Sequence, residues 1–142
     1  MTPGAVRQFL RFTLGAILLA SAAGKLVDIP GFMDVLKTYK AFPDSILLLL
    51  ALGVPLAELA IALWLFSGQF LAAAALTSVV MHLLYAVWAA VSVLRGLRLA
   101  NCGCFGVFWP RPLGWSTVAQ DLVMTAASFA LLVLARRPRA PA

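Results

Sequence analysis

The stretch LAIALWLFSGQFLAAAALTSVVMHLLYAVWAAVSVL, residues 59–94, contains no lysine, arginine, aspartate or glutamate. It is well beyond the roughly 18 apolar residues that indicate a transmembrane helix. Ser67-Gly68-Gln69, near its middle, has the composition of a tight turn. The stretch therefore predicts two membrane-spanning helices that form an antiparallel hairpin.

The composition extends this interpretation to the whole chain. Of its 142 residues, 63% are hydrophobic and 11% are charged, against about 45–50% and about 25% in soluble domains. Four spans are predicted, at approximately residues 9–27, 45–66, 70–94 and 116–135. Each has roughly the 20 residues that cross the hydrocarbon core, and a lone strand would leave backbone groups unpaired in lipid. We therefore expect one all-α domain over residues 1–142, an integral membrane four-helix bundle.

The net charge of +6 does not indicate nucleic-acid binding. The basic residues lie at the ends of apolar runs, where lysine and arginine anchor spans among lipid headgroups. The sequence left between the spans is too short for a soluble catalytic domain. The expected surroundings are the lipid bilayer, with no nucleic-acid partner.

Local signals refine the span ends. The second span is expected to begin near Pro43-Asp44-Ser45, with Asp44 or Ser45 as the N-cap, and the fourth near Ser116 as the N-cap. A short amphipathic helix lying in the membrane interface is expected between spans one and two, with a plain loop as the alternative. Pro30 suits the first turn of that helix. Apolar residues then recur at helical spacing, at Phe32, Met33, Leu36 and Tyr39.

The first span also resembles a secretory signal peptide. Arg7 and Arg11 precede an apolar run, and Ala20-Ser21-Ala22 has the small residues of a cleavage site. Lys25 and Asp28, which follow, have the character of a retained helix end. We therefore expect this segment to remain as span one.

The two cysteines lie two residues apart, in the motif Asn101-Cys102-Gly103-Cys104-Phe105-Gly106 between spans three and four. Two residues of extended chain span about 6.6–7.2 Å, whereas a disulfide requires Cα atoms about 4.4–6.8 Å apart. The chain must therefore bend at Gly103, which has the necessary backbone freedom. The small ring is expected to be strained, and a strained disulfide is labile or catalytic rather than a durable staple. A redox role for Cys102 and Cys104 is the leading interpretation, with a soft-metal site or an inert pair as alternatives.

The metal alternative has few ligands. A closed soft-metal site needs three or four N or S ligands, and the chain offers two cysteines and one histidine. His82 lies mid-span, so only a two-coordinate Cu(I) or Hg(II) site stays open. Basic residues flank the loop and are expected to favour the thiolate form. They are Arg95, Arg98 and Arg111.

Four ionisable residues in or beside the spans are candidates for supporting roles. Glu58 lies mid-span after Pro55, where a charge is costly unless it faces a partner or a cavity. Lys25 and Asp28 lie about one turn apart at the end of span one, and Asp121 lies about one turn into span four. We expect a polar cluster beneath the cysteine loop, with Glu58 too deep to join it. Alternatively, Lys25 and Asp28 reach the headgroups, and Asp121 favours a helix N-terminus.

The remaining polar and aromatic residues have simpler interpretations. His82 is expected to be a satisfied interior histidine, with a proton relay as the alternative. The four tryptophans lie near predicted span ends and are expected to form an aromatic belt. They are Trp64, Trp88, Trp109 and Trp115.

Charge alone does not decide the topology. With both termini cytoplasmic, five basic residues lie on that side and six on the other, which gives no bias by the positive-inside count. They are Arg7, Arg11, Arg136, Arg137 and Arg139 inside, and Lys25, Lys37, Lys40, Arg95, Arg98 and Arg111 outside. A dithiol that cycles through a disulfide suits an oxidising compartment. We therefore expect the cysteine loop to face the periplasm or cell exterior.

Taken together, these motifs resemble the MauE family of methylamine-utilisation proteins, part of the wider MauE/DoxX group of redox-associated membrane proteins. The resemblance runs from span one to span four, and the Cys-Gly-Cys-Phe-Gly stretch is its most specific part. Gln120 stands where a basic residue is expected before Asp121, so a charge pair is not implied there. The matching residues are Ser21-Ala22-Ala23-Gly24-Lys25-Leu26-Val27-Asp28, Phe32, Tyr39, Pro55-Leu56-Ala57-Glu58, Cys102-Gly103-Cys104-Phe105-Gly106, Trp115 and Asp121.

The resemblance implies a four-helix protein of the bacterial inner membrane. It also implies support for disulfide formation or maturation in periplasmic client proteins, alongside a thioredoxin-like partner. We expect a thiol–disulfide relay that works as a quinone-linked oxidoreductase, with a non-redox assembly factor as an alternative. One dithiol releases two electrons and the chain has no second cysteine pair, so a quinone bound between the helices is the expected acceptor. The expected site consists of Cys102 and Cys104 as the redox pair, supported by Gly103, Lys25, Asp28, Glu58 and Asp121.

Overall fold

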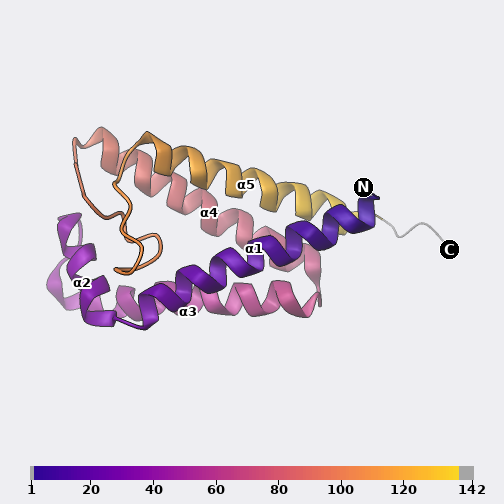
Figure 1. Ribbon diagram of the computed structural model, residues 1–142, viewed down its shortest axis with the longest axis horizontal. Coiled ribbons are helices and arrows are strands. Elements are labelled where there is room, and N and C mark those ends of the chain that lie inside the picture. Colours follow the sequence, from indigo (N-terminus) through magenta and orange to yellow (C-terminus); the bar gives the residue numbers. More distant parts are fainter. Residues whose placement is uncertain (1, 138–142) are drawn as a thin grey trace.

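The computed structural model describes residues 2–137, which are all-helical apart from their connections (Figure 1). Four helices are long and apolar enough to cross a membrane, so the predicted all-α membrane bundle is confirmed. Arg139, counted above among the cytoplasmic charges, lies outside the described residues. The helices are α1 (Pro3–Leu26), α2 (Ile29–Thr38), α3 (Asp44–Ser67), α4 (Leu71–Leu94) and α5 (Trp115–Arg136).

Caps on α1 and α2 explain where these helices begin. Helix α1 starts at Pro3 rather than near residue 9, because the Thr2 hydroxyl accepts a hydrogen bond from the Ala5 N–H at 3.2 Å. Helix α2 is the short helix predicted between spans one and two, with proline in its first turn. Its N-cap is Asp28, whose carboxylate accepts from the Gly31 N–H at 2.9 Å. Asp28 therefore has a structural task at this junction.

The N-caps predicted for α3 and α5 are wrong. Pro43 and Gly114 occupy those positions in extended conformations, and neither makes a side-chain capping bond. The helices begin earlier than expected, because the cap lies one residue before Asp44 in α3 and two residues before Ser116 in α5. Asp44 and Ser45 therefore fall inside the first turn of α3, and Ser116 falls inside the first turn of α5.

The long helices form two antiparallel pairs, α1 with α3 and α4 with α5 (Figure 1). The predicted turn between α3 and α4 is present, with Gly68 in the left-handed region at φ 69°. Beyond this turn, however, α3 and α4 make few contacts and diverge. The predicted hairpin therefore holds at its turn only, and the two pairs separate toward the end that carries α2 and the cysteine loop.

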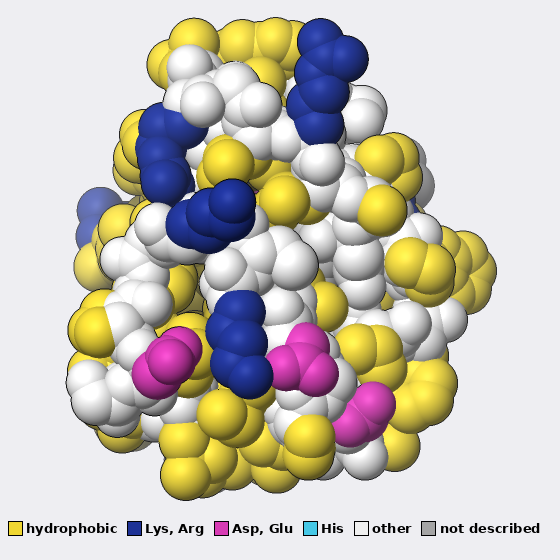
Figure 2. Space-filling model, turned by 90° about the vertical axis from the view of Figure 1, so that its left-hand side faces the viewer, with side chains coloured by type: hydrophobic (Ala, Val, Ile, Leu, Met, Phe, Trp, Pro, Cys, Tyr) yellow, Lys and Arg dark blue, Asp and Glu magenta, His cyan; other side chains and the backbone are white. Residues whose placement is uncertain are grey.

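A dry core joins the pairs near the other end, where α1 begins and α5 ends (Figure 1). Small residues let helix backbones approach closely where lipid offers no hydrophobic driving force. This core combines leucines with alanines: Leu14, Leu18, Ala62, Leu65, Ala74, Ala75, Leu131 and Leu132. Figure 2 shows the opposite, loop-bearing end, where acidic and basic side chains lie among apolar ones. The polar features considered next lie on the loop side of the dry core.

Candidate functional site

The two cysteines form a disulfide whose Cα atoms are 5.5 Å apart. The predicted bend is present, because Gly103 has φ 77°. Gly103 also packs tightly on α2, since a Cβ placed there would come within 2.9 Å of Val35 Cγ1 and 3.2 Å of Phe32 Cε2. A larger residue at this position would therefore strain the backbone and displace the loop from α2.

Asn101 organises the backbone around the disulfide. Its side-chain oxygen accepts from the Gly103 N–H at 2.9 Å, and its side-chain nitrogen donates to the Gly106 carbonyl at 3.0 Å. The Cys102 N–H donates to the Arg111 carbonyl at 2.7 Å, which links the motif to the segment of the loop that leads back to α5. The cysteine pair is therefore held in a defined loop conformation rather than on a free segment.

The loop rests directly on α1 through two glycines. A Cβ at Gly24 would overlap the Phe105 carbonyl oxygen, and a Cβ at Gly106 would overlap the Gly24 carbonyl. Gly106 also has φ 69°, in the left-handed region. Both glycines are needed for this approach, which explains physically why the Gly24-Lys25 and Cys-Gly-Cys-Phe-Gly motifs belong together.

Lys25 and Glu58 form a buried ion pair, with Nζ at 2.8 Å from Oε1 and 2.9 Å from Oε2. The expectation that Glu58 lies too deep to join Lys25 is wrong. Helical side chains tilt toward the N-terminus of their own helix. Because α1 and α3 are antiparallel, the Lys25 side chain leans inward while the Glu58 side chain leans toward the loop, so the two meet.

Two hydroxyl groups complete the surroundings of the Glu58 carboxylate. Tyr85 on α4 donates to Oε1 at 2.6 Å. The Ser21 hydroxyl lies 2.9 Å from the same oxygen and 2.7 Å from the Cys104 carbonyl, and its single proton serves one of them at a time. Side chains from α1 and α4 therefore converge on the carboxylate of Glu58, which lies on α3 in the interior of the bundle.

Hydrogen bonds from two side chains hold the backbone of the disulfide at both of its carbonyl groups. Lys25 Nζ donates to the Cys104 carbonyl at 2.9 Å, and the Tyr39 hydroxyl donates to the Cys102 carbonyl at 2.7 Å. Burial, with a smaller contribution from the charge of Asp121, raises the pKa of Tyr39 to about 12. Tyr39 therefore remains a hydrogen-bond donor throughout the physiological pH range.

The other predicted supporting residues have different surroundings. Asp28 caps α2 and makes no recorded side-chain contact with the Lys25–Glu58 pair. Asp121 is buried, with 7% of its surface exposed, and no hydrogen bond to its carboxylate is recorded within residues 2–137. The neighbouring Gln120 accepts a hydrogen bond from Arg111. A basic side chain is thus brought to this part of α5 by the loop rather than by α5 itself.

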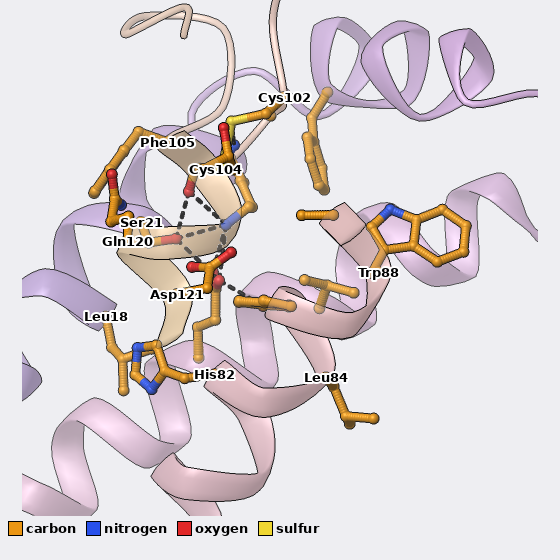
Figure 3. A pocket seen from close by; sticks show the side chains of 18 of the residues that line it. Leu18, Ser21, His82, Leu84, Trp88, Cys102, Cys104, Phe105, Gln120 and Asp121 are labelled. Carbon is orange, nitrogen blue, oxygen red and sulfur yellow. Dashed lines mark hydrogen bonds and ion pairs between the residues drawn. A yellow bond between two sulfur atoms is a disulfide. The ribbon is translucent and has the colours of Figure 1, made fainter. Parts of the chain in front are cut away.

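A cavity of about 340 Å³ lies between the helix pairs, with the disulfide in its wall (Figure 3). Its volume falls in the range of about 300–1,000 Å³ that is usual for small-molecule sites. The ionisable and amide side chains on the wall, apart from the cysteines, are Lys25, Tyr39, Glu58, His82, Tyr85, Gln120 and Asp121. Most of the remaining wall is apolar, with residues that include Leu18, Leu36, Phe42, Leu50, Val54, Leu84 and Trp88.

Aromatic rings form one side of this cavity. Trp88 is half-buried and lies 5.1 Å from Phe42 and 5.4 Å from Tyr39, measured between ring centroids. Trp88 is therefore a wall residue, whereas Trp109 and Trp115 are exposed, as an aromatic belt requires. The arrangement can hold a flat, largely apolar molecule beside a disulfide.

Residues 4–135 match the family described as methylamine utilisation protein MauE. The chain belongs to this family. Relatives that carry this name occur in Paracoccus denitrificans (32% identity over 86% of this chain and 66% of the relative), Paracoccus versutus (33%, 91% and 70%) and Methylorubrum extorquens (30%, 96% and 73%). The chain thus spans about two thirds of the length of the first relative. No solved structure matches it.

In this MauE family member, two arginines that flank the disulfide loop, Arg95 and Arg111, donate hydrogen bonds to groups other than the sulfur atoms. Arg95 donates to the Tyr39 carbonyl at 3.2 Å, and Arg111 donates to Gln120. These two arginines therefore brace the loop and its neighbours rather than contact sulfur. Over residues 2–137, no three His, Cys, Asp or Glu side chains are grouped to hold a metal ion.

Sequence reasoning gave no role to Ser21, Tyr85 or Asn101. Ser21 lies four residues before Lys25, so helical spacing places the two on one face, and this signal was available. No sequence signal joins Tyr85 to Glu58, because the two residues lie on different helices, α4 and α3, and only their side chains bridge these helices here. His82 has the interior role expected of it, with Nδ1 at 2.9 Å from the Ser78 carbonyl.

Proposed function

We propose that this protein is a membrane thiol–disulfide relay that acts through Cys102 and Cys104, with the cysteine loop facing the periplasm. The observation that carries the proposal is a disulfide set in the wall of a bundle cavity and hydrogen-bonded at both carbonyls. A ring that encloses one residue removes almost no entropy from the unfolded chain, so this bond contributes little as a staple. Thiol–disulfide exchange is a role that a disulfide held in this way can perform.

The burial of the two sulfur-bearing residues suggests the order of events. Cys102 is buried at 8% exposure, packed near Tyr39 and Leu113, whereas Cys104 is only half-buried. We infer that a client thiolate attacks Cys104 Sγ. A new S–S bond then joins the client to Cys104, the Cys102–Cys104 bond breaks, and the electron pair leaves on Cys102 Sγ.

The backbone stabilises that leaving thiolate. The Cys104 N–H lies 3.3 Å from Cys102 Sγ and donates to it, and a hydrogen bond to a charged acceptor is stronger than one to a neutral acceptor. The client's second thiolate then attacks its own sulfur in the mixed disulfide and releases the Cys104 thiolate. The client is oxidised by two electrons, and the cysteine pair is reduced by two.

The cavity beside the pair suits a quinone, which would supply the two-electron acceptor that restores the disulfide. Its aromatic wall matches a flat ring, and its size matches a small-molecule site. Lys25 and Glu58 already use their hydrogen-bonding capacity on each other, Ser21, Tyr85 and Cys104. Within residues 2–137 the Asp121 carboxylate has no hydrogen-bond partner, unlike Lys25 and Glu58, so we assign proton handling to Asp121 and a positioning role to Lys25 and Glu58.

The proposed client is an extracytoplasmic protein that contains disulfides, and the proposed partner is a thioredoxin-like protein. The named relatives are methylamine utilization proteins, and we place this chain in the same process.

The proposed location is the bacterial inner membrane with both termini cytoplasmic. A membrane-impermeant maleimide should then label the reduced loop in intact spheroplasts. Labelling that requires membrane disruption would contradict this orientation.

Trapping of mixed disulfides tests the relay. Cys102→Ser leaves the half-buried Cys104 thiol and should accumulate mixed disulfides with client or partner. Cys104→Ser leaves the buried Cys102 thiol and should accumulate fewer. The double variant serves as the control and should trap nothing and fail to support client maturation. If the double variant supports maturation at the wild-type level, the protein is a non-redox assembly factor. Stoichiometric binding of Cu(I), without any mixed disulfide, would favour the metal alternative.

Reoxidation is tested separately. Purified reduced protein should reduce a soluble ubiquinone or menaquinone analogue in an amount equal to the thiol pairs oxidised. Rapid exchange with a thioredoxin-like protein but no quinone reduction would mean that a partner chain carries the electrons onward. The relay would then stand without the quinone.

A further inference from the structure

A second cavity, of about 250 Å³, lies at the other end of the bundle from the disulfide. It is formed by the first turns of α1, the turn between α3 and α4, and the end of α5. Three arginines line it, Arg7 and Arg11 from α1 and Arg137 after α5, together with Gln8 and Gly68. A strongly cationic cavity at the ends of membrane spans has no part in the redox proposal.

The side chains of the protein offer this cavity no counter-charge. The sequence has five acidic residues, and none of them lines the cavity. Two ion pairs are recorded in residues 2–137, Lys25–Glu58 and Lys37–Asp34, and both lie on the loop side of the molecule. Figure 2 shows acidic side chains among the basic ones at that loop-bearing end. The three arginines therefore repel one another unless an anion lies between them.

Arg11 is held in place by two of its nitrogens, whereas the third has no hydrogen-bond partner among the described residues. Its Nη2 donates to the Phe66 carbonyl at 2.7 Å, and its Nη1 donates to Gln8 Oε1 at 3.0 Å. A Cβ on Gly68 would come within 2.7 Å of Nη1, so the guanidinium packs directly on the turn. Its Nε is buried and has no hydrogen-bond partner among the described residues. A buried donor without an acceptor is costly, and an anion in the cavity would supply one.

We propose that this cavity binds a phosphate-bearing anion. Guanidinium groups present a planar fork of donors that matches phosphate oxygens. Basic pockets between transmembrane helices are characteristic sites for anionic lipid headgroups, and the ends of the spans lie at headgroup depth. The phosphate comes either from an anionic phospholipid or from a soluble phosphate compound. The site has the same chemistry in both cases.

The experiment uses the full chain in nanodiscs of phosphatidylcholine, with or without phosphatidylglycerol. The number of phosphatidylglycerol molecules retained is measured by native mass spectrometry. In parallel, inorganic phosphate is titrated against detergent-solubilised protein. Arg7→Gln and Arg137→Gln are the test variants, because both arginines line the cavity and neither side chain donates a hydrogen bond within residues 2–137. Arg98→Gln, an exposed arginine at the loop end, is the matched control for charge.

Each test variant is expected to weaken retention about fivefold, the usual contribution of one basic residue beside an anionic membrane. Arg98→Gln should behave as the wild type. Selective retention of phosphatidylglycerol supports a lipid source, and saturable binding of inorganic phosphate, weakened by the same variants, supports a soluble source. The proposal is overturned if neither ligand binds, or if Arg98→Gln reduces binding as much as the test variants do.

Discussion

Replacing Glu58 by glutamine should destabilise the protein substantially. The Lys25 ammonium is 3% exposed and Glu58 is fully buried, with 2.8 Å between Nζ and Oε1. Breaking a buried ion pair by removing one partner costs about 3–5 kcal/mol, because the other charge is left uncompensated. Glutamine keeps an oxygen for the Tyr85 hydroxyl, so we expect a loss near the lower end, about 3 kcal/mol.

A double-mutant cycle isolates the pair from the rest of the cluster. Lys25→Met leaves the Glu58 carboxylate without its cation, so it should cost a similar amount. The double variant Lys25→Met/Glu58→Gln removes both charges and should cost less than the sum of the two single variants. A coupling of about 2–3 kcal/mol is expected for residues in direct contact in one network.

The assay is reversible unfolding in bicelles, with disulfide exchange measured on the same samples. Lys25 also holds the Cys104 carbonyl, so Glu58→Gln should slow exchange as well as lower stability. If the single-variant effects add to within about 0.5 kcal/mol, the two charges do not form the pair described here. If Glu58→Gln exchanges disulfides at the wild-type rate, Glu58 is structural only and its positioning role is wrong.

Three further predictions follow from the surroundings of the disulfide. Gly106→Ala should destabilise the protein by more than about 1–2 kcal/mol, which is the cost of the left-handed conformation alone. Gly53→Ala is the control, because a Cβ at Gly53 has open space, and it should stabilise the protein by up to about 1 kcal/mol. Equal effects of the two variants in thermal unfolding would contradict the close contact between the loop and α1. Tyr39→Phe should cost about 1 kcal/mol through the lost bond to the Cys102 carbonyl. The pKa of Tyr39 is raised to about 12 in the folded protein, above about 10 in the unfolded chain. The contribution of Tyr39 to the free energy of unfolding is therefore complete below about pH 10 and is lost as pH rises toward about 12. If Tyr39→Phe shows the same dependence of stability on pH as the wild type over that range, this reasoning is refuted. Asp121→Asn should slow reoxidation of the cysteines by a soluble quinone without preventing folding, and an unchanged rate would remove Asp121 from proton handling.

The sequence by itself determined that the chain is helical and which of its segments span the membrane. Long apolar runs without charges can only be spanning helices in lipid, since every backbone group must be paired within the segment. The two-residue spacing of the cysteines required a bend at Gly103, because an extended chain holds their Cα atoms too far apart. Both inferences depend on local chain geometry, which the sequence fixes without knowledge of any partner helix.

Only the tertiary structure decided which residues meet. In lipid, any apolar helix face is acceptable, so hydrophobicity does not reveal that α1 pairs with α3 and α4 with α5. That pairing brings Lys25 to Glu58, places Gly24 beneath Gly106, and opens the cavity behind the disulfide. Depth counted along the span misplaced Glu58, because each side chain leans toward the N-terminus of its own helix, and in an antiparallel pair Lys25 and Glu58 therefore lean toward each other. The ionisable residues were visible in the sequence, but their partners were set by contacts between segments far apart in the chain.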